Sequence, residues 1–323
     1  MAQTFRPPWW LAHAHFQTLW PTLARRTKSA RFYRERLELP DGDFLDLDWT
    51  RSASERAGAP TVIVFHGLEG SIHSPYAHGM MSAIHRCGWN GVLMHFRGCS
   101  GSANRTDRRY HSGETEDAAY VLSYLQRCGI EQIGAVGFSL GGNMLLKWLG
   151  ETGPSNPLSS AVAISVPYDL SRAAQRLETG FSRFYQWWLM RSMRRSVLRQ
   201  FANRDDPPID LSKVAATRTF REFDNAVTAP LHGFRDADHY YEHCSARRYV
   251  RDIAVPTLLI QAADDPFMFS DVIPLPCELP ACVQLDNPAH GGHVGFVQGT
   301  VPWRLQYWHE TRVCEHIAKQ WPN

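Results

Sequence analysis

The sequence lacks an excess of charge of either sign, since its 323 residues include 34 lysines and arginines and 32 aspartates and glutamates. A nucleic-acid-binding protein normally carries a marked basic excess, so this balance argues against that class. No apolar run approaches the roughly 18 residues that a membrane-spanning helix needs. Internal repeats and low-complexity tracts are absent as well. We therefore expect a globular protein with no nucleic-acid partner.

Cysteine is scarce and irregularly placed. The 7 cysteines are an odd number without a Cys-x-x-Cys pair, so neither a disulfide framework nor a zinc ribbon is predicted. The N-terminal segment is aromatic and is interrupted by prolines and histidines, unlike the uninterrupted apolar core of a signal peptide. Together these features predict a soluble protein of a reducing compartment, the cytoplasm.

Segments of strand and helix character alternate along the chain. Strands are expected at about 34–39, 44–49, 61–65, 91–96, 131–137, 160–166, 256–261 and 282–285, and helices at about 75–87, 115–127 and 143–149. The turn at 40–43 makes the first two strands a hairpin. The alternation that follows predicts a mostly parallel sheet with helices on both faces and with its active site at the carboxyl ends of the strands.

Residues 170–251 interrupt this alternation, and strands of the same kind flank them. A chain of this length can bury about three quarters of its unfolded surface in one large core. We therefore expect a single domain, residues 1–323, with residues 170–251 as a helical cap inserted within it. No long flexible linker separates the two parts.

Residues 181–201, inside this insertion, have the pattern of a basic amphipathic helix. Apolar side chains recur at steps of four, and five arginines lie mainly off that line. Arginines with tryptophans suit an anionic lipid interface, which would give a weak membrane-surface or lipid contact. A cap helix packed on the body with solvated arginines has the same pattern, and we favour it. Two interpretations are also open for the aromatic residues near the N-terminus, Trp9, Trp10 and Trp20. They could form the wall of a pocket, or they could anchor the N-terminal arm against the core.

Residues Gly137 to Gly141 read Gly-Phe-Ser-Leu-Gly between a predicted strand and a predicted helix. A serine in so tight a strand-to-helix turn projects its hydroxyl out of the backbone, and the two glycines leave room for the neighbouring chain. The helix that follows offers unpaired amides where an anionic intermediate would form. The same pentapeptide occurs in ordinary loops, but the flanking strand and helix favour catalysis. We predict that Ser139 is a nucleophile.

A serine nucleophile needs a histidine as its base. We choose His293, which directly follows two glycines in a loop after the last predicted strand, and keep His290 as the alternative. A His-x-x-His pair can also suggest a metal site. This loop, however, lacks a neighbouring carboxylate or cysteine set, so no metal is predicted.

The base in turn needs a carboxylate to fix its tautomer. Asp264, Asp265 and Pro266 follow the strand at 256–261 directly. We choose Asp265, because its place before the proline suits a loop aspartate turned across the strand ends, whereas Asp264 could cap the turn or meet water. Both are also ordinary turn formers, but the chain order of Ser139, Asp265 and His293 is that of a nucleophile-elbow hydrolase.

Backbone amides must stabilise the oxyanion that forms on the substrate, and loss of one such donor typically costs about 2.7 to 4 kcal/mol. We predict two donors. One is the amide of Leu140, directly after the nucleophile, and the other is the amide of Leu68 in the loop after the strand at 61–65. His66 and Glu69, in the same loop, are expected to organise it and to take no part in the chemistry.

Six ordered motifs extend over most of the chain. They are HFQT at 15–18, HGLEGS at 66–71, FRGCSG at 96–101, GFSLGGN at 137–143, AADDPF at 262–267 and GGHVGF at 291–296. With these motifs the sequence resembles the α/β-hydrolase superfamily, and within it the branch of YheT-like esterases related to mammalian ABHD lipid hydrolases. The resemblance implies an eight-stranded sheet and carboxylic ester hydrolysis by a triad of Ser139, Asp265 and His293, with the amides of Leu68 and Leu140. It does not identify the ester.

The function predicted from these features is a serine carboxylesterase that forms an acyl-enzyme on Ser139. Its partner would be a small-molecule ester, short-chain or lipid-like, and no cofactor is expected. Two alternatives stay open. One is an acyltransferase or thioesterase with the same triad, and the other is a noncatalytic ligand-binding protein on a hydrolase fold. The sequence does not indicate the oligomeric state.

Overall fold

The computed structural model describes residues 4–25, 30–56 and 58–321. Its strands are β1 (Tyr33–Glu38), β2 (Phe44–Trp49), β3 (Thr61–Phe65), β4 (Asn90–Met94), β5 (Ile133–Phe138), β6 (Ser160–Ile164), β7 (Thr257–Ile260), β8 (Val283–Asp286), β9 (Val297–Gln298) and β10 (Gln306–Tyr307). In this described part of the chain, the first eight form one sheet in the order β1-β2-β4-β3-β5-β6-β7-β8. β2 is antiparallel to both of its neighbours, and the other neighbouring strands are parallel. The predicted hairpin and mostly parallel sheet are confirmed.

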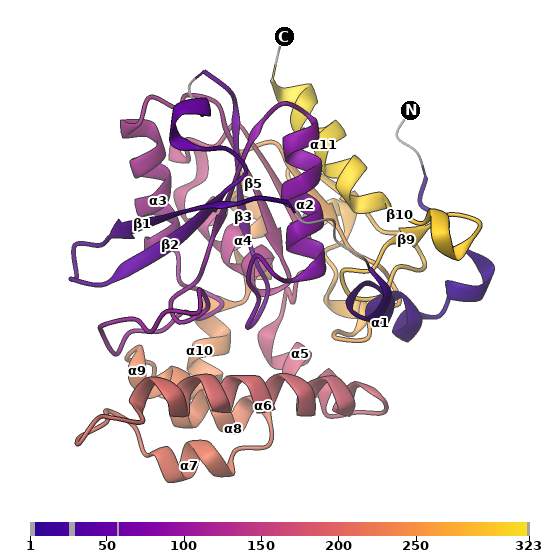
Figure 1. The fold of residues 1–323 in the computed structure, drawn as a ribbon. Coiled ribbons are helices and arrows are strands. Elements are labelled where there is room, and N and C mark those ends of the chain that lie inside the picture. The colour runs from indigo at the N-terminus through magenta and orange to yellow at the C-terminus, as the bar shows by residue number, and fades with distance from the viewer. Residues whose placement is uncertain (1–3, 26–29, 57, 322–323) are drawn as a thin grey trace.

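Helices cover both faces of this sheet (Figure 1). They are α1 (Ala14–Ala24), α2 (Pro75–Arg86), α3 (Glu116–Arg127), α4 (Leu140–Thr152), α5 (Leu170–Leu177), α6 (Ser182–Phe201), α7 (Leu211–Ala216), α8 (Phe220–Phe223), α9 (Ala229–Leu231), α10 (Ala237–Cys244) and α11 (Trp308–Gln320). Among the residues described, none of these helices combines the length and the apolarity that are needed to cross a bilayer.

The core has two layers because alternate side chains of a strand point to opposite faces of the sheet. In β3, Ile63 and Phe65 belong to one buried cluster, which includes side chains of α3 and α4. Val62 and Val64 belong to the other, which includes side chains of α2 and α11. The central strands are buried on both faces, as expected for parallel strands between two helical layers.

The helices α5 to α10 lie between β6 and β7 in the sequence and gather beyond one edge of the sheet, at the bottom of Figure 1. α6 buries Tyr185, Met193, Val197 and Phe201 on one side. The last three belong to an apolar cluster with side chains of α7 and α8, and Leu68 packs against that cluster from the body of the protein. The predicted amphipathic helix is confirmed, and its buried side faces the other helices and the loop after β3.

Candidate active site

Ser139 stands at the turn between β5 and α4, as predicted. Its backbone has φ 49° and ψ −116°, a conformation that side-chain-bearing residues adopt only at a cost of about 1 to 3 kcal/mol. A Cβ atom on Gly137 would lie 2.5 Å from the carbonyl oxygen of Gly141, and one on Gly141 would lie 2.5 Å from that of His66. Only glycine fits at both positions, because the atoms in the way are backbone. The packing of β5, α4 and the loop after β3 therefore holds the strained turn in place.

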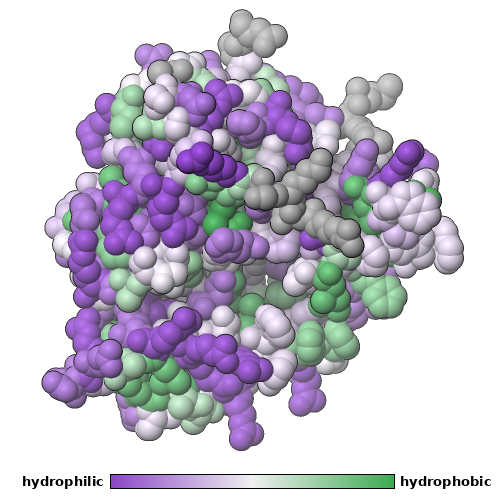
Figure 2. All heavy atoms as spheres, viewed as in Figure 1, coloured by the Kyte–Doolittle hydropathy of each residue, from purple (hydrophilic) through white to green (hydrophobic). Residues whose placement is uncertain are grey.

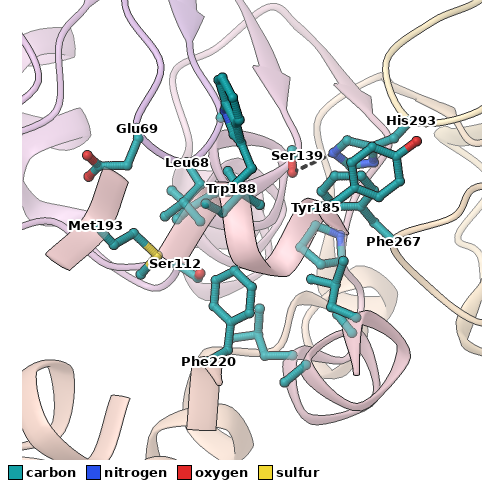
Figure 3. Close-up of a pocket in the computed structure, with 18 of the residues that line it drawn as sticks. Leu68, Glu69, Ser112, Ser139, Tyr185, Trp188, Met193, Phe220, Phe267 and His293 are labelled. Carbon is teal, nitrogen blue, oxygen red and sulfur yellow. Dashed lines mark hydrogen bonds between the residues drawn. The ribbon is translucent and has the colours of Figure 1, made fainter. Parts of the chain in front are cut away.

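The structure brings the three predicted triad residues together. Ser139 Oγ lies 3.0 Å from His293 Nε2, and His293 Nδ1 lies 2.9 Å from Asp265 Oδ2 (Figure 3 shows the serine and the histidine). Asp265 is buried, and the amide of Phe267 donates to its Oδ1 at 2.9 Å. Because a carboxylate only accepts hydrogen bonds, the proton of the neutral imidazole belongs on Nδ1, which leaves Nε2 free to accept from the serine hydroxyl.

The aromatic ring of Phe267 stacks on the imidazole of His293, with centroids 3.9 Å apart and planes 9° from parallel. The imidazole is therefore held on its face by the Phe267 ring and at Nδ1 by the carboxylate of Asp265. Phe267 was not among the site residues predicted from the sequence. Its signal was the place of an aromatic residue two positions after the chosen aspartate.

The two alternatives from the sequence form a separate pair. His290 Nδ1 lies 3.2 Å from Asp264 Oδ2, and His290 is exposed. The amide of Gly292 donates to Asp264 Oδ1 at 2.9 Å. Burial raises the pKa of the Asp264 carboxyl. The pair thus braces the base of the glycine loop that carries His293, and neither residue contacts Ser139.

Leu140 directly follows Ser139, and Leu68 follows Gly67, where a Cβ atom would lie 3.4 Å from that of Ser139. Neither leucine amide has a hydrogen-bond partner in the part of the chain that the structure describes. Leu140 begins α4, where the first amides of a helix are unpaired. Leu68 follows Gly67, whose amide donates to the hydroxyl of Tyr76 at 2.8 Å. Unpartnered backbone amides next to a nucleophile are the kind of donor that an oxyanion hole requires.

His66 sets the direction of the Leu68 amide. Its Nδ1 donates to the carbonyl of Gly67 at 2.7 Å, and its Nε2 accepts from the amide of Phe96 at 3.1 Å. Because the C=O and the N–H of one planar peptide point in opposite directions, fixing the Gly67 carbonyl also fixes the Leu68 amide. Burial lowers the pKa of His66 to about 3, so the imidazole stays neutral and keeps one donor and one acceptor.

Glu69 links the same loop to the rest of the structure. Its amide donates to the hydroxyl of Tyr110 at 2.9 Å, and that hydroxyl donates back to Glu69 Oε1 at 2.9 Å. Ser192, on α6, donates to Glu69 Oε2 at 3.2 Å. His66 and Glu69 therefore organise the loop, as the sequence suggested.

The N-terminal arm, residues 4–25, makes hydrogen bonds with the loop of His293, which the sequence did not indicate. Thr18 Oγ1 accepts from the amide of His293 at 2.9 Å. The buried side chain of Gln17 donates to the carbonyl of Val297 at 3.0 Å and accepts from its amide at 2.8 Å. The arm therefore acts as an anchor for the loop that carries His293.

A cavity of about 410 Å³ starts at Ser139 and His293 and continues along α6, and Figure 3 shows part of its lining. Most of its lining is apolar or aromatic, and it includes Leu68, Tyr185, Trp188, Met193, Phe220 and Phe267. Asp224 is a buried exception, and the hydroxyls of Thr228 and Tyr241 donate to its carboxylate at 2.6 and 2.7 Å. Burial raises the pKa of Asp224 to about 6.

His111, Glu114 and His232 place ligand-type atoms within 4.8 Å of one another, and the two histidines line the same cavity. The carboxylate of Glu114 forms a salt bridge with Arg108, whose guanidinium donates a hydrogen bond to it at 2.7 Å. A cation bound here would have to displace that guanidinium. Burial also lowers the pKa of both imidazoles, so they form a neutral, polar part of the cavity wall.

Comparison with known proteins gives consistent results. A family model described as "alpha/beta hydrolase fold" matches residues 60–300. The Escherichia coli (strain K12) protein named "Putative esterase YheT" is 47% identical over 316 residues, which cover 97% of this chain and 93% of that protein. "Phospholipase ABHD3" of Mus musculus is 27% identical, covering 95% and 76%. The solved Pyrococcus furiosus esterase Pf2001 shares the fold, with a TM-score of 0.60 at 17% identity over 99% of both chains.

Proposed function

Because this chain belongs to the α/β-hydrolase fold family and is an esterase- or lipase-type hydrolase, we propose that it hydrolyses carboxylic esters through an acyl-enzyme on Ser139. One observation carries the proposal. An unbroken series of contacts runs from Asp265 through His293 to Ser139, beside the unpartnered amides of Leu68 and Leu140.

The reaction begins when Ser139 Oγ attacks the carbonyl carbon of the ester and His293 Nε2 takes the hydroxyl proton. The amides of Leu68 and Leu140 donate to the oxyanion of the tetrahedral intermediate. The intermediate collapses, the C–O bond to the alcohol breaks, and His293 gives its proton to the leaving alcohol. Asp265 keeps the imidazole oriented and stabilises its charged form.

A water molecule then takes the place of the alcohol. His293 accepts a proton from this water, and the resulting hydroxide attacks the acyl carbon. A second tetrahedral intermediate forms and collapses to the carboxylic acid. The proton returns from His293 to Ser139 Oγ, so the enzyme ends as it began and no cofactor is consumed.

We propose residues 170–251 as the cap of a single domain, with the acyl group lying in the apolar cavity beneath α6. Burial of each CH₂ of an alkyl chain stabilises binding by about 0.8 kcal/mol. An apolar cavity of this size therefore favours esters whose acyl chain is longer than the acetyl group. A location in the cytoplasm stays a prediction from the sequence.

Turnover of p-nitrophenyl esters of increasing acyl length tests the proposal. In Ser139→Ala we expect kcat to fall at least about 10³-fold, because the nucleophile is gone. Ser123→Ala, an exposed serine on α3, is the matched control and should retain full activity. Equal rates in wild type and Ser139→Ala would support the noncatalytic alternative, and ester formation with an added alcohol in place of hydrolysis would support an acyltransferase.

A further inference from the structure

An exposed aromatic surface surrounds the mouth of the cavity. We call it the aromatic patch, and its side chains, each between 42% and 80% exposed, are Phe16, Leu23, Phe181, Phe184, Trp187 and Trp188. Four of them form a row of ring contacts, with centroids 5.6 Å apart for Phe181 and Phe184, 6.0 Å for Phe184 and Trp187, and 6.4 Å for Trp187 and Trp188. Grouped exposed apolar side chains mark an interaction surface, whereas single ones do not.

The row is continuous with the N-terminal arm. The ring of His15 lies 4.6 Å from that of Phe181, and His15 Nδ1 lies 3.0 Å from the hydroxyl of Tyr185. Figure 2 shows apolar side chains, drawn in green, gathered around the position that α1 has in Figure 1. Two segments far apart in the sequence thus share one surface.

Positive charge is concentrated on the same surface. The 20 residues of α6 include five arginines and no aspartate or glutamate. Arg183, Arg191, Arg195 and Arg199 are exposed, and none has an ion-pair partner in the part of the chain that the structure describes. The segment 1–34 also contains no acidic residue, although the whole chain has a net charge of only +2. The occupant of this surface should therefore be apolar and anionic.

The patch also opens into the cavity. Leu23, Phe184 and Trp188 are exposed to solvent and at the same time line the cavity that contains Ser139. An acyl chain that leaves an apolar phase at this mouth would reach the nucleophile along apolar side chains. The buried side of α6 packs against α7, α8 and Leu68, and its exposed side is free to meet a partner.

We propose that the aromatic patch docks on an anionic phospholipid bilayer and that lipid acyl esters enter the cavity from that bilayer. Amphipathic surfaces with tryptophan and arginine bind at the boundary of head groups and acyl chains, and each arginine near an anionic surface adds about 1 kcal/mol, roughly a fivefold gain in partition. A second copy of the chain is a poorer occupant, because two such basic surfaces would repel each other. The entry of substrate rests on the proposed function, whereas the docking does not.

Co-sedimentation with vesicles tests the docking. The Ser139→Ala protein is used, so that no lipid is consumed, with vesicles of phosphatidylcholine alone or mixed with phosphatidylglycerol. We expect binding to the mixed vesicles, and little to phosphatidylcholine. Arg183→Glu, Arg191→Glu and Arg195→Glu together should lower the partition coefficient at least roughly 100-fold, and added salt should weaken binding of the parent protein. Trp187→Ser should lower it on its own.

Matched controls lie outside the patch. Leu275→Ser and Arg251→Glu remove an exposed leucine and an exposed arginine elsewhere, and both should bind as the parent does. Thermal unfolding checks that each variant is folded. Equal binding to both kinds of vesicle, or an equal loss in the controls, would overturn the proposal. So would a concentration-dependent dimer, seen by light scattering, that Trp187→Ser abolishes while vesicles do not bind.

The same measurements separate this inference from the proposed function. Vesicle binding by Ser139→Ala together with a wild-type protein that hydrolyses no ester would leave the docking intact and overturn the proposed reaction. Hydrolysis of water-soluble esters without vesicle binding would leave the reaction intact and overturn the docking.

Discussion

Replacing Asp265 with asparagine tests the hydrogen-bond direction in the proposed triad while it changes the shape of the side chain very little. The amide of Phe267 donates to Asp265 Oδ1 at 2.9 Å, so the asparagine should keep its oxygen at that position. Its NH₂ group then occupies the place of Oδ2, 2.9 Å from His293 Nδ1. Two donors cannot share that contact, and Nδ1 must give up its proton and accept. The proton moves to Nε2, which faces Ser139 Oγ at 3.0 Å.

An imidazole with its proton on Nε2 cannot accept the proton of the serine. In serine proteases with this geometry the corresponding change lowers kcat about 10⁴-fold, which is about 5.5 kcal/mol of barrier at 1.36 kcal/mol for each factor of ten. The NH₂ at the place of Oδ2 also meets Gln261 Nε2, which donates to Oδ2 at 3.2 Å, but the Gln261 side chain can turn its unpartnered Oε1 toward it. In the opposite orientation the NH₂ would face the backbone amide of Phe267, which cannot turn, and two donors would stay unpaired at about 1 to 3 kcal/mol each. We therefore expect a loss of kcat close to 10⁴-fold in Asp265→Asn.

Steady-state hydrolysis of p-nitrophenyl butyrate gives kcat and KM for this variant. Asp264→Asn is the matched control, since Asp264 contacts His290 and the amide of Gly292 but not His293. We expect the control to keep kcat within about tenfold of wild type, because it loses at most a hydrogen bond that braces the loop. A larger loss in Asp264→Asn than in Asp265→Asn would refute the assignment of the triad carboxylate.

Three further variants test other contacts. The folded-state pKa of Asp224 is raised to about 6 from 3.8, so the folded protein binds this proton more tightly than the unfolded chain does, and the associated stability is lost as the pH rises from about 4 to 6. Chemical denaturation should show that, relative to wild type, the unfolding free energy of Asp224→Asn rises by about 2 kcal/mol between pH 4 and pH 7.5. The same change with pH in both proteins would contradict the assignment. Thr18→Val removes the acceptor for the amide of His293, and we expect kcat to fall by up to about tenfold; an unchanged kcat would show that the arm does not position the loop. Asn143→Ala removes three hydrogen bonds made by a buried amide, and denaturation should show about 3 kcal/mol lost from the free energy of unfolding, where a loss below about 1 kcal/mol would contradict this role.

The sheet could be predicted from the sequence because its strands are buried on both faces. The run Thr61–Phe65 is wholly apolar and β-branched or aromatic except at its first residue, and it forms β3 with the predicted bounds. Other ends shifted by one or two residues, as for β5, which begins at Ile133 rather than at 131. Such shifts are expected, since hydrogen bonds with neighbouring strands decide where a strand begins.

The site could be predicted in part, because each of its residues follows a predicted strand. Strand ends of a parallel sheet meet at one edge, so Ser139, Asp265 and His293 were expected near one another before their distances were known. The role of Thr18 could not be predicted, because it depends on a hydrogen bond between residues that are 275 positions apart. No local pattern encodes such a contact.

The sequence left open whether the tryptophans of α6 face a lipid surface or the helix packs on the body with its arginines solvated, and the packed helix was favoured. The apolar line at steps of four identifies the side that packs, and the structure buries Tyr185 and Val197 on it. Trp187 and Trp188 lie off that line, and a helical pattern alone does not say whether residues off the line face solvent or another element. Only the arrangement of the cap helices and the N-terminal arm settles that they are exposed.

The central claim is that Ser139 is the nucleophile, and covalent labelling tests it most directly. A fluorophosphonate probe reacts with a serine hydroxyl that a neighbouring base activates, and mass spectrometry of the digested protein locates the adduct. We expect one adduct per chain, on Ser139, with no labelling of Ser139→Ala. An adduct on another residue, or equal labelling of wild type and Ser139→Ala, would contradict it.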